Sequence, residues 1–258
     1  ELENWVGTRL MHRTTRRLSL TDAGQAFLIQ CKQLVDLSDD IEKQAQHRSN
    51  KPSGTLRIAC SFSLAQSLLS YASAEFTQQY PDVKINLVVN NKNVNLIEEG
   101  IDLAIRISND LDPNQIAIPL GSCHSVLCAA PAYLSQHDPI THPNQLQQHN
   151  CLSYDYFGTT HWKLSKGDQY YRIPISGSIS SNEANVLLFS SLHGSGISQQ
   201  PLYSAQPFIH NGSLVAILSD WDLPVLGIHA IYASRQQMTP ALRVFIDFIK
   251  QRFQGITL

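Results

Sequence analysis

The spacing of apolar side chains divides the chain at one polar stretch. Residues 22–47 contain no proline and carry apolar side chains seven positions apart, at Phe27, Leu34 and Ile41. This spacing predicts one long helix with a single apolar stripe. The stripe can pack on its own domain or on a second copy of the chain. The polar linker at residues 47–54, directly after the helix, favours the second copy.

Residues 1–20 predict the end of a helix followed by a small hairpin. Gly7 is a suitable helix stop after the apolar residues around Trp5. Residues 13–20 mix β-branched residues with arginines, which predicts two short strands with a basic tip. Thr21 then provides an N-cap for the long helix.

After the linker, apolar strands alternate with helices. The first set is expected as strand 56–60, helix 61–80, strand 83–89, helix 93–100 and strand 102–107. The second set is expected as strand 125–130, strand 151–154, a hairpin around Trp162, strand 171–180, helix 183–193 and strand 213–218. A strand at 229–233 and a helix at 240–253 return to the first set. This alternation predicts two similar α/β lobes with mostly parallel sheets and a ligand cleft between them.

The composition allows one large domain or several small ones. Hydrophobic residues make up 43% and charged residues 16% of the 258 residues, which is enough for a buried core. No apolar run is long enough to cross a membrane, and the first residues lack the pattern of a secretory signal. A cytoplasmic protein with no membrane partner is therefore expected. The five cysteines are odd in number and widely spaced, which indicates buried reduced thiols and not a disulfide framework.

Positive charge is concentrated near the N-terminus, although the net charge of the whole chain is −2. The segment from Thr8 to Arg17 contains no acidic residue and holds a cluster of arginines: Arg9, Arg13, Arg16 and Arg17. A basic cluster ahead of a mildly acidic body indicates contact with a polyanion. A solvated basic loop is the alternative interpretation.

Known catalytic motifs are missing from the sequence. It contains no G-x-S-x-G, no H-E-x-x-H and no Walker sequence, and its histidines have no chelating spacing. Gly194-Ser195-Gly196 resembles part of a phosphate loop, but it follows a predicted helix and not a strand, so a helix C-cap is the better interpretation. The expectation is a protein that is not an enzyme and has no catalytic residue, metal site or cofactor.

Two strand-to-helix junctions carry residues that bind anions. Residues 61–63 (SFS) follow the first strand, and residues 180–182 (SSN) precede the helix of the second lobe. Hydroxyls and free N–H groups at a helix N-terminus favour an anion such as a carboxylate. Ordinary N-capping uses the same residue types. If both junctions face one cleft, they predict a carboxylate pocket.

A series of short motifs runs along the chain in a specific order and spacing. The motifs are residues 6–7 (VG), 20–24 (LTDAG), 56–59 (LRIA), 99–106 (EGIDLAIR), 131–134 (PAYL), 149–152 (HNCL), 212–215 (GSLV) and Pro240 with Arg243 and Phe245. Together they resemble the LysR-type transcription regulators of bacteria.

The resemblance implies an α/β fold with two Rossmann-like lobes of a periplasmic-binding-protein-like effector domain, preceded by a winged-helix remnant and a long dimerisation helix. Residues 1–20 match the recognition-helix end and wing of a winged helix-turn-helix DNA-binding domain. Residues 21–53 match the dimerisation helix and hinge, and residues 54–258 match the effector-binding domain. In that domain, lobe I is expected at about 54–123 and 227–258, and lobe II at about 124–226.

The resemblance also implies a function and partners. The chain is expected to regulate transcription, to bind double-stranded DNA and to be controlled by a small-molecule effector held between the lobes. Homodimers through the long helix, tetramers and RNA polymerase are the expected protein partners. By position, Arg9, Arg13, Arg16 and Arg17 lie in or beside the wing, where arginines contact phosphates or enter the minor groove. The matches to the effector cleft are Ser61, Phe62, Ser63, Arg106, Asn182 and Ile197.

Three departures from the family pattern modify these expectations. The sequence begins within the recognition helix, so this stretch is not expected to read bases in a major groove. Ser108 replaces a common glycine, and residues 198–200 (SQQ) replace apolar residues, which favours a more polar effector. The competing hypothesis is a two-lobed solute-binding protein, which would need a signal peptide and would have no use for the basic wing or the long apolar stripe.

Overall fold

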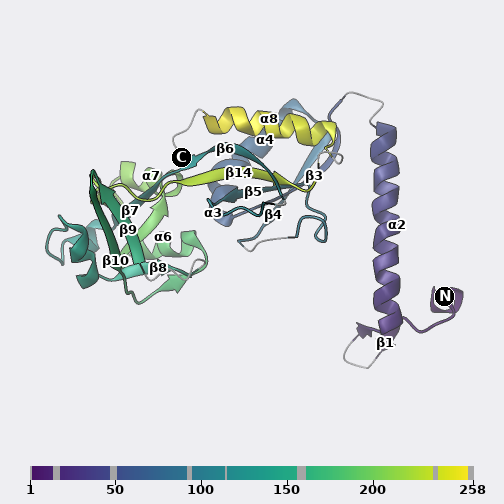
Figure 1. The fold of residues 1–258 in the computed structure, drawn as a ribbon, viewed down its shortest axis with the longest axis horizontal. Helices are drawn as coiled ribbons and strands as arrows, with labels where there is room; N and C mark the ends of the chain where they lie inside the picture. The colour runs from purple at the N-terminus through teal and green to yellow at the C-terminus, as the bar shows by residue number, and fades with distance from the viewer. Residues whose placement is uncertain are drawn as a thin grey trace. The chain divides into compact units, whose positions relative to one another are not determined.

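The chain divides into two units between Lys51 and Pro52. The computed structural model describes residues 2–13, 18–46, 51–91, 95–113, 115–155, 161–234 and 238–254. The smaller unit contains a hairpin and one long helix, and the larger unit contains two five-stranded sheets with their helices (Figure 1).

The smaller unit has the elements that its sequence predicts. Helix α1 (Leu2–Val6) ends at Gly7, whose φ is +73°. Strands β1 (Met11–Arg13) and β2 (Leu18–Leu20) pair antiparallel. Helix α2 (Asp22–Gln46) follows as one uninterrupted element. The predicted helix stop, hairpin and long helix are confirmed.

Thr21 caps α2, as its position predicts. Its Oγ1 accepts a hydrogen bond from the N–H of Gly24 (2.9 Å) and its hydroxyl donates to the carbonyl oxygen of Arg9 (2.7 Å). A Cβ atom at Gly24 would lie 1.9 Å from the carbonyl oxygen of Leu10, so only glycine fits at this first turn. The Glu3 carboxylate accepts from the N–H groups of Leu10 (2.8 Å) and Met11 (3.0 Å). These bonds hold the start of the hairpin between α1 and α2.

Helix α2 exposes apolar side chains along its length in a single chain. The exposed ones are Leu28, Ile29, Leu34, Val35 and Leu37, and Leu34 is 66% exposed. Phe27 is half-buried, whereas the side chain of Ile41 lies outside the described residues. An apolar stripe of this kind is stable in water only when another surface covers it.

The first lobe of the larger unit is built on a sheet with the order β4-β3-β5-β14-β6. Its strands are β3 (Gly54–Cys60), β4 (Val83–Val89), β5 (Leu103–Ile107), β6 (Ile116–Cys123) and β14 (Leu226–Tyr232). Strand β3 pairs parallel with β4 and β5, whereas β14 pairs antiparallel with β5 and β6. Figure 1 shows β6 and β14 side by side along the lobe.

Helices cover this sheet and enclose an apolar core. They are α3 (Phe62–Leu64), the π-helical turn η1 (Ala65–Leu69), α4 (Ser70–Gln79) and α8 (Pro240–Gln254). Helices α4 and α8 lie next to each other (Figure 1), where the rings of Phe76 and Phe245 are 5.0 Å apart and both side chains are fully buried. Burial of these two rings is part of the apolar burial that stabilises the lobe.

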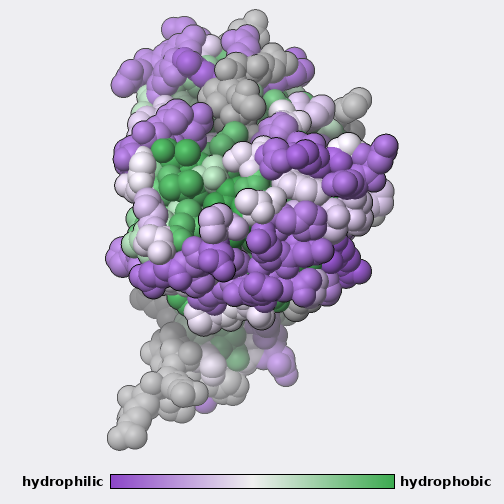
Figure 2. Space-filling model, turned by 90° about the vertical axis from the view of Figure 1, so that its left-hand side faces the viewer, coloured by the Kyte–Doolittle hydropathy of each residue, from purple (hydrophilic) through white to green (hydrophobic). Residues whose placement is uncertain are grey.

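The second lobe has a sheet of the same size with the order β11-β8-β12-β7-β13. Its strands are β7 (Ser125–Ala129), β8 (Cys151–Tyr154), β11 (Ser180–Ser181), β12 (Ile197–Pro201) and β13 (Val215–Ile217). A separate hairpin is formed by β9 (His161–Lys166) and β10 (Gln169–Pro174). The helices are α5 (Pro131–Leu134), η2 (Pro143–Gln148), α6 (Ala184–Leu192) and α7 (Leu202–His210). From the side on which β10 lies, the surface is mainly hydrophilic around one apolar area (Figure 2).

Both sheets are mixed, so the prediction of mostly parallel sheets was wrong. In each sheet, parallel pairs on one side are followed by antiparallel pairs on the other. The antiparallel pairs arise because the chain leaves the first lobe through β6, enters the second through β7 and returns through β14. Strands that run out and back beside each other must pair antiparallel.

Local details also differ from the sequence prediction. Residues 95–100 form successive turns and not part of a helix, with Gly100 at φ +60°. The predicted helix over 61–80 is present but includes the π-helical turn η1. Strands β6 and β12 and helix α7 were missed. The predicted C-cap at Gly194 is confirmed, because the N–H of Gly194 bonds to the carbonyl of Ser191 and that of Ser195 to the carbonyl of Ser190, the Schellman pattern.

Candidate functional site

The first predicted junction lies where β3 passes into α3. Ser61 is the N-cap of α3, and its Oγ accepts from the N–H of Leu64 (3.4 Å). Ser63 is 5% exposed, and its hydroxyl lies 3.1 Å from the hydroxyl of Tyr203 in the first turn of α7. A residue of the first lobe is thus hydrogen-bonded to a residue of the second lobe.

Further polar contacts join the same two lobes. Asn91, just after β4, donates through Nδ2 to the carbonyl oxygen of Asn182 (3.0 Å) and to the Glu183 carboxylate. Asn185 in α6 donates through Nδ2 to Oε1 of Gln66 in η1 (2.5 Å). These hydrogen bonds and the contact between Ser63 and Tyr203 lie where both lobes present strand ends and helix starts. In α/β folds, ligands bind at such positions.

The second junction is capped by an acidic residue. Glu183 is the N-cap of α6, and its Oε1 accepts from the N–H of Asn185 (3.3 Å). Asn182, which the sequence predicts at this anion-binding junction, contributes its backbone carbonyl to Asn91. A carboxylate of the protein itself therefore occupies the position at which a helix N-terminus attracts an anion.

The other residues predicted for the cleft have different surroundings. Phe62 is 46% exposed at the start of α3. Arg106 is half-buried at the end of β5 and donates from Nη1 to the carbonyl oxygen of Asn90 (3.0 Å). Ile197 is fully buried and packs in the apolar core of the second lobe with Leu127 and Trp162. The structure thus brings Ser61, Ser63 and Asn182 to the contact region between the lobes and places the Ile197 side chain in a core.

Sequence reasoning missed several residues that make the contacts between the lobes: Gln66, Asn91, Glu183, Asn185 and Tyr203. Tyr203 is 140 residues from Ser63 in sequence, so no local pattern connects them. For Glu183, the sequence offered no N-cap signal, because Glu is not among the usual N-cap residues Ser, Thr, Asp and Asn.

Burial keeps a phenol and two thiols in and near this region protonated. Burial raises the pKa of the Tyr203 phenol, which therefore remains protonated. Burial raises the pKa of Cys60 to about 11, with Arg106 opposing this in part, and raises the pKa of Cys128 to about 11, with the hydrogen bond to Ser198 opposing it. Such thiols are poor nucleophiles and metal ligands. In the part of the chain that the structure describes, His, Cys, Asp and Glu form no cluster able to hold a metal ion.

The predicted basic cluster is described only in part. Arg9 is exposed, directly before the hairpin. Arg13 ends β1, but its side chain lies outside the described residues, and Arg16 and Arg17 lie outside them altogether. Strands β1 and β2 pair antiparallel, with Arg13 opposite Leu18.

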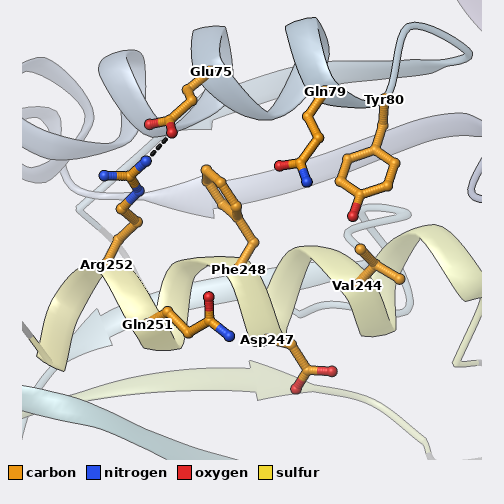
Figure 3. A pocket seen from close by; sticks show the side chains of 8 residues that line it. All are labelled: Glu75, Gln79, Tyr80, Val244, Asp247, Phe248, Gln251 and Arg252. Atoms are coloured by element: carbon orange, nitrogen blue, oxygen red, sulfur yellow. Dashed lines mark ion pairs between the residues drawn. The ribbon is translucent and has the colours of Figure 1, made fainter.

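A groove of about 570 Å³ lies elsewhere, between α4 and α8 of the first lobe. Figure 3 shows Phe248 between the two helices and the ion pair of Glu75 with Arg252 at one end. Both charged side chains are about half exposed, so water screens their attraction. The groove contains none of the residues that join the lobes.

Comparison with known proteins is consistent with this architecture. The family described as LysR substrate binding domain matches residues 49–254. The chain belongs to the LysR family. Its larger unit is the effector-binding domain of a transcription regulator, which favours the regulator over the competing solute-binding hypothesis.

The chain matches individual transcription regulators over most of their length. The chain is 30% identical to an HTH-type transcriptional regulator of Xanthomonas campestris pv. campestris, over 98% of this chain and 75% of that protein. It is 29% identical to the HTH-type transcriptional activator TtdR of Escherichia coli, over 96% of this chain and 80% of TtdR. The full-length structure of the Vibrio cholerae virulence activator AphB superposes with a TM-score of 0.76 at 28% identity, covering 100% of this chain and 87% of AphB. Among the described residues, no helix is both long and apolar enough to cross a membrane.

Proposed function

We propose that this LysR-family regulator acts in the cytoplasm by binding double-stranded DNA, and that an effector held between its lobes controls this binding. One observation carries the effector part of the proposal. The lobes are joined by hydrogen bonds between polar side chains, including Ser63 with Tyr203, Asn91 with Glu183 and Gln66 with Asn185. A ligand that enters this region can replace these bonds with its own and so change how the lobes are held.

The basic hairpin is the proposed DNA contact of this stretch of sequence. Arg9, Arg13, Arg16 and Arg17 occur without an acidic residue among them, and Arg13 ends β1, which pairs antiparallel with β2. Arginines on a short hairpin can bond to phosphates and enter a minor groove. They are expected to strengthen binding to any duplex and not to select a sequence.

The long helix is the proposed dimer contact. Leu34 and Val35 of α2 are 66% and 60% exposed in a single chain, and a second copy of α2 would cover them. Dimers of this kind, assembled further into tetramers on DNA and in contact with RNA polymerase, would complete the regulator.

A binding titration tests the proposal. The full-length regulator is titrated against the DNA upstream of its own gene and a scrambled duplex by fluorescence anisotropy. Tighter binding to the natural DNA, with affinity falling steeply as salt rises, is the expected result. Arg13→Ala should weaken binding to both duplexes and lower the salt dependence, whereas Lys84→Ala, in β4, serves as a charge-matched control. Equal affinity for both duplexes at every salt concentration would count against sequence-specific regulation.

A further inference from the structure

One side chain of the second lobe is buried without a hydrogen-bond partner. Gln200, in β12, is 0% exposed, and neither its Nε2 nor its Oε1 has a partner among the residues that the structure describes. A buried primary amide offers two donor hydrogens and an acceptor oxygen. Leaving all of them unpaired is strongly unfavourable, so such a group normally meets a ligand or an ordered water.

Two other orphan atoms occur on the elements that pack against β12. Asn185, 7% exposed in the first turn of α6, has no partner for Oδ1, and Ser204, 5% exposed in the first turn of α7, has none for Oγ among the described residues. Asn185 uses only its Nδ2, toward Gln66. Because orphan groups are infrequent in folded proteins, three in adjoining elements indicate one common occupant.

The alignment of α6 on β12 brings these groups toward one end of the lobe. The hydroxyls of Ser191 in α6 and Ser198 in β12 are 2.8 Å apart. From this contact, Asn185 lies six residues back toward the N-terminus of the same helix, about 9 Å along its axis. Gln200 lies two residues forward on the same strand face, roughly 6.6 Å along. Both directions lead to the end of the lobe where Tyr203 meets Ser63 of the first lobe.

The free atoms define the chemistry of the occupant. Gln200 Oε1 and Asn185 Oδ1 are acceptors, so they need N–H or O–H donors, whereas Gln200 Nε2 donates and Ser204 can do either. An ionised carboxylate only accepts hydrogen bonds and leaves both oxygens unpaired. A carboxamide or a polyol presents donors and acceptors together.

The charges around these groups also disfavour an anion. Elements α6, β12 and α7 contain no Lys or Arg. Glu183 caps α6 beside Asn185 with a negative charge, while the Tyr203 phenol is kept protonated by burial, which raises its pKa. A buried anion without a cationic partner is costly.

We propose that Gln200, Asn185 and Ser204 recognise the effector, and that this effector is an uncharged molecule with both hydrogen-bond donors and acceptors, of the carboxamide or polyol class. This deepens the proposed function and rests on it. It replaces the carboxylate pocket that the two junctions predict from sequence. Gln200 is the specificity-determining residue of the site.

The first arm of the test needs no ligand. Gln200→Met replaces the amide by an apolar side chain of similar length, and urea unfolding of the ligand-free chain is compared with wild type and with Gln199→Met, one position away on the opposite face of β12. Removing unpaired polar atoms from a dry site should raise the urea midpoint for Gln200→Met but not for Gln199→Met. An unchanged or lower midpoint would show that the protein already satisfies the amide and would overturn the proposal.

The second arm tests the charge of the occupant. Thermal shift of the same chain is measured with matched pairs, acetate and acetamide, succinate and succinamide, benzoate and benzamide, and with the polyols glycerol and myo-inositol. The proposal expects neutral compounds to raise the melting temperature more than their carboxylates, and affinity for them to fall about tenfold or more in Gln200→Met. A carboxylate that binds best and depends on Gln200 would overturn it. No shift with any compound would also overturn it and leave an ordered water as the occupant.

The readout separates this inference from the proposed function. Thermal shift does not involve DNA, so failure of DNA binding leaves its result standing. Conversely, a regulator that prefers its natural DNA but binds only carboxylates would keep the proposed function and lose this inference.

Discussion

The two lobes share one sheet design but differ in what they bury. Each has parallel pairs on one side of its sheet and antiparallel pairs on the other. The first lobe closes around apolar rings such as Phe76 and Phe245, whereas most of the buried polar side chains among the described residues belong to the second lobe: Asn185, Ser191, Ser198, Gln200 and Ser204. Only Ser63 adds to this set from the first lobe, and it faces Tyr203.

This difference indicates a division of roles. Apolar burial stabilises the first lobe without specifying a ligand. Buried polar groups contribute little net stability unless every partner is present, but they discriminate between ligands. We therefore propose that the second lobe carries ligand recognition and that the first lobe supports it.

The largest effect is expected from a truncating substitution in the apolar core of the first lobe. Phe76 is fully buried, with the rings of Tyr80, Phe245 and Phe248 within 4.6 to 5.3 Å. Phe76→Ala should lower the free energy of unfolding by about 3–5 kcal/mol, since it removes the ring and leaves a cavity. Urea denaturation followed by circular dichroism measures this. A loss no larger than that of the exposed Phe62→Ala would contradict the role given to the first lobe.

A smaller effect is expected in the polar interior of the second lobe. The Ser191 hydroxyl lies 3.1 Å from the carbonyl oxygen of Gly196 and 2.8 Å from Oγ of Ser198. The Ser191 hydroxyl donates toward both acceptors, so its one proton is shared between Oγ of Ser198 and the carbonyl oxygen of Gly196. Ser191→Ala leaves the fully buried Ser198 hydroxyl without this partner and should cost about 1–3 kcal/mol of unfolding free energy.

A double-mutant cycle sharpens this prediction. Ser191→Ala with Ser198→Ala removes both hydroxyls, so the pair should cost less than the sum of the single changes. The exposed Ser135→Ala, in the same lobe, serves as the control for loss of a hydroxyl. Strict additivity would mean that the two serines do not act as a pair and that the polar interior is less coupled than the structure indicates.

The sequence predicts the smaller unit more fully than the sheets, for physical reasons. The end of α1 at Gly7, the Thr21 cap and helix α2 depend on backbone freedom, capping and apolar periodicity. All three are properties of residues that are close in sequence. Strand β12 (Ile197–Pro201) lies inside its sheet but contains Ser198 and Gln200, so its pattern lacks the apolar run of a buried strand. Strand β6 is interrupted in the same way by Pro119 and Gly121.

Of the candidate site, the sequence predicted only the two strand-to-helix junctions. Ser61 and Ser63 were found because strand-to-helix transitions attract capping residues. The partners across the lobes, such as Tyr203 and Asn185, are placed by the folding of the second lobe and are more than a hundred residues from Ser63 and Gln66 in sequence. Ile197 shows the limit of assigning residues from the family resemblance. It matches a position of the effector cleft, but its side chain packs in the core of the second lobe.

The smallest expected effect is a dependence on pH that originates in the second lobe. The His149 and His137 rings are 5.2 Å apart, and Nδ1 of His149 lies 3.3 Å from the Tyr133 hydroxyl, which accepts from the N–H of Asn150. The phenol can therefore donate to Nδ1 only while His149 is neutral. Burial, followed by the charge of His137, lowers the pKa of His149 below its usual 6.5, with Asp138 opposing this.

The sign of the pH effect follows from this lowered pKa. Near pH 8, His149 is almost entirely uncharged in both states and contributes almost no slope. As pH falls through 6.5, the unfolded chain binds a proton before the folded chain does, so the free energy of unfolding decreases. Urea midpoints measured from about pH 8 to about pH 5 should fall for wild type and fall less for His149→Gln. The exposed His210→Gln, at the end of α7, should keep the wild-type slope. An unchanged slope in His149→Gln would place the acid sensitivity elsewhere and remove this contrast between the lobes.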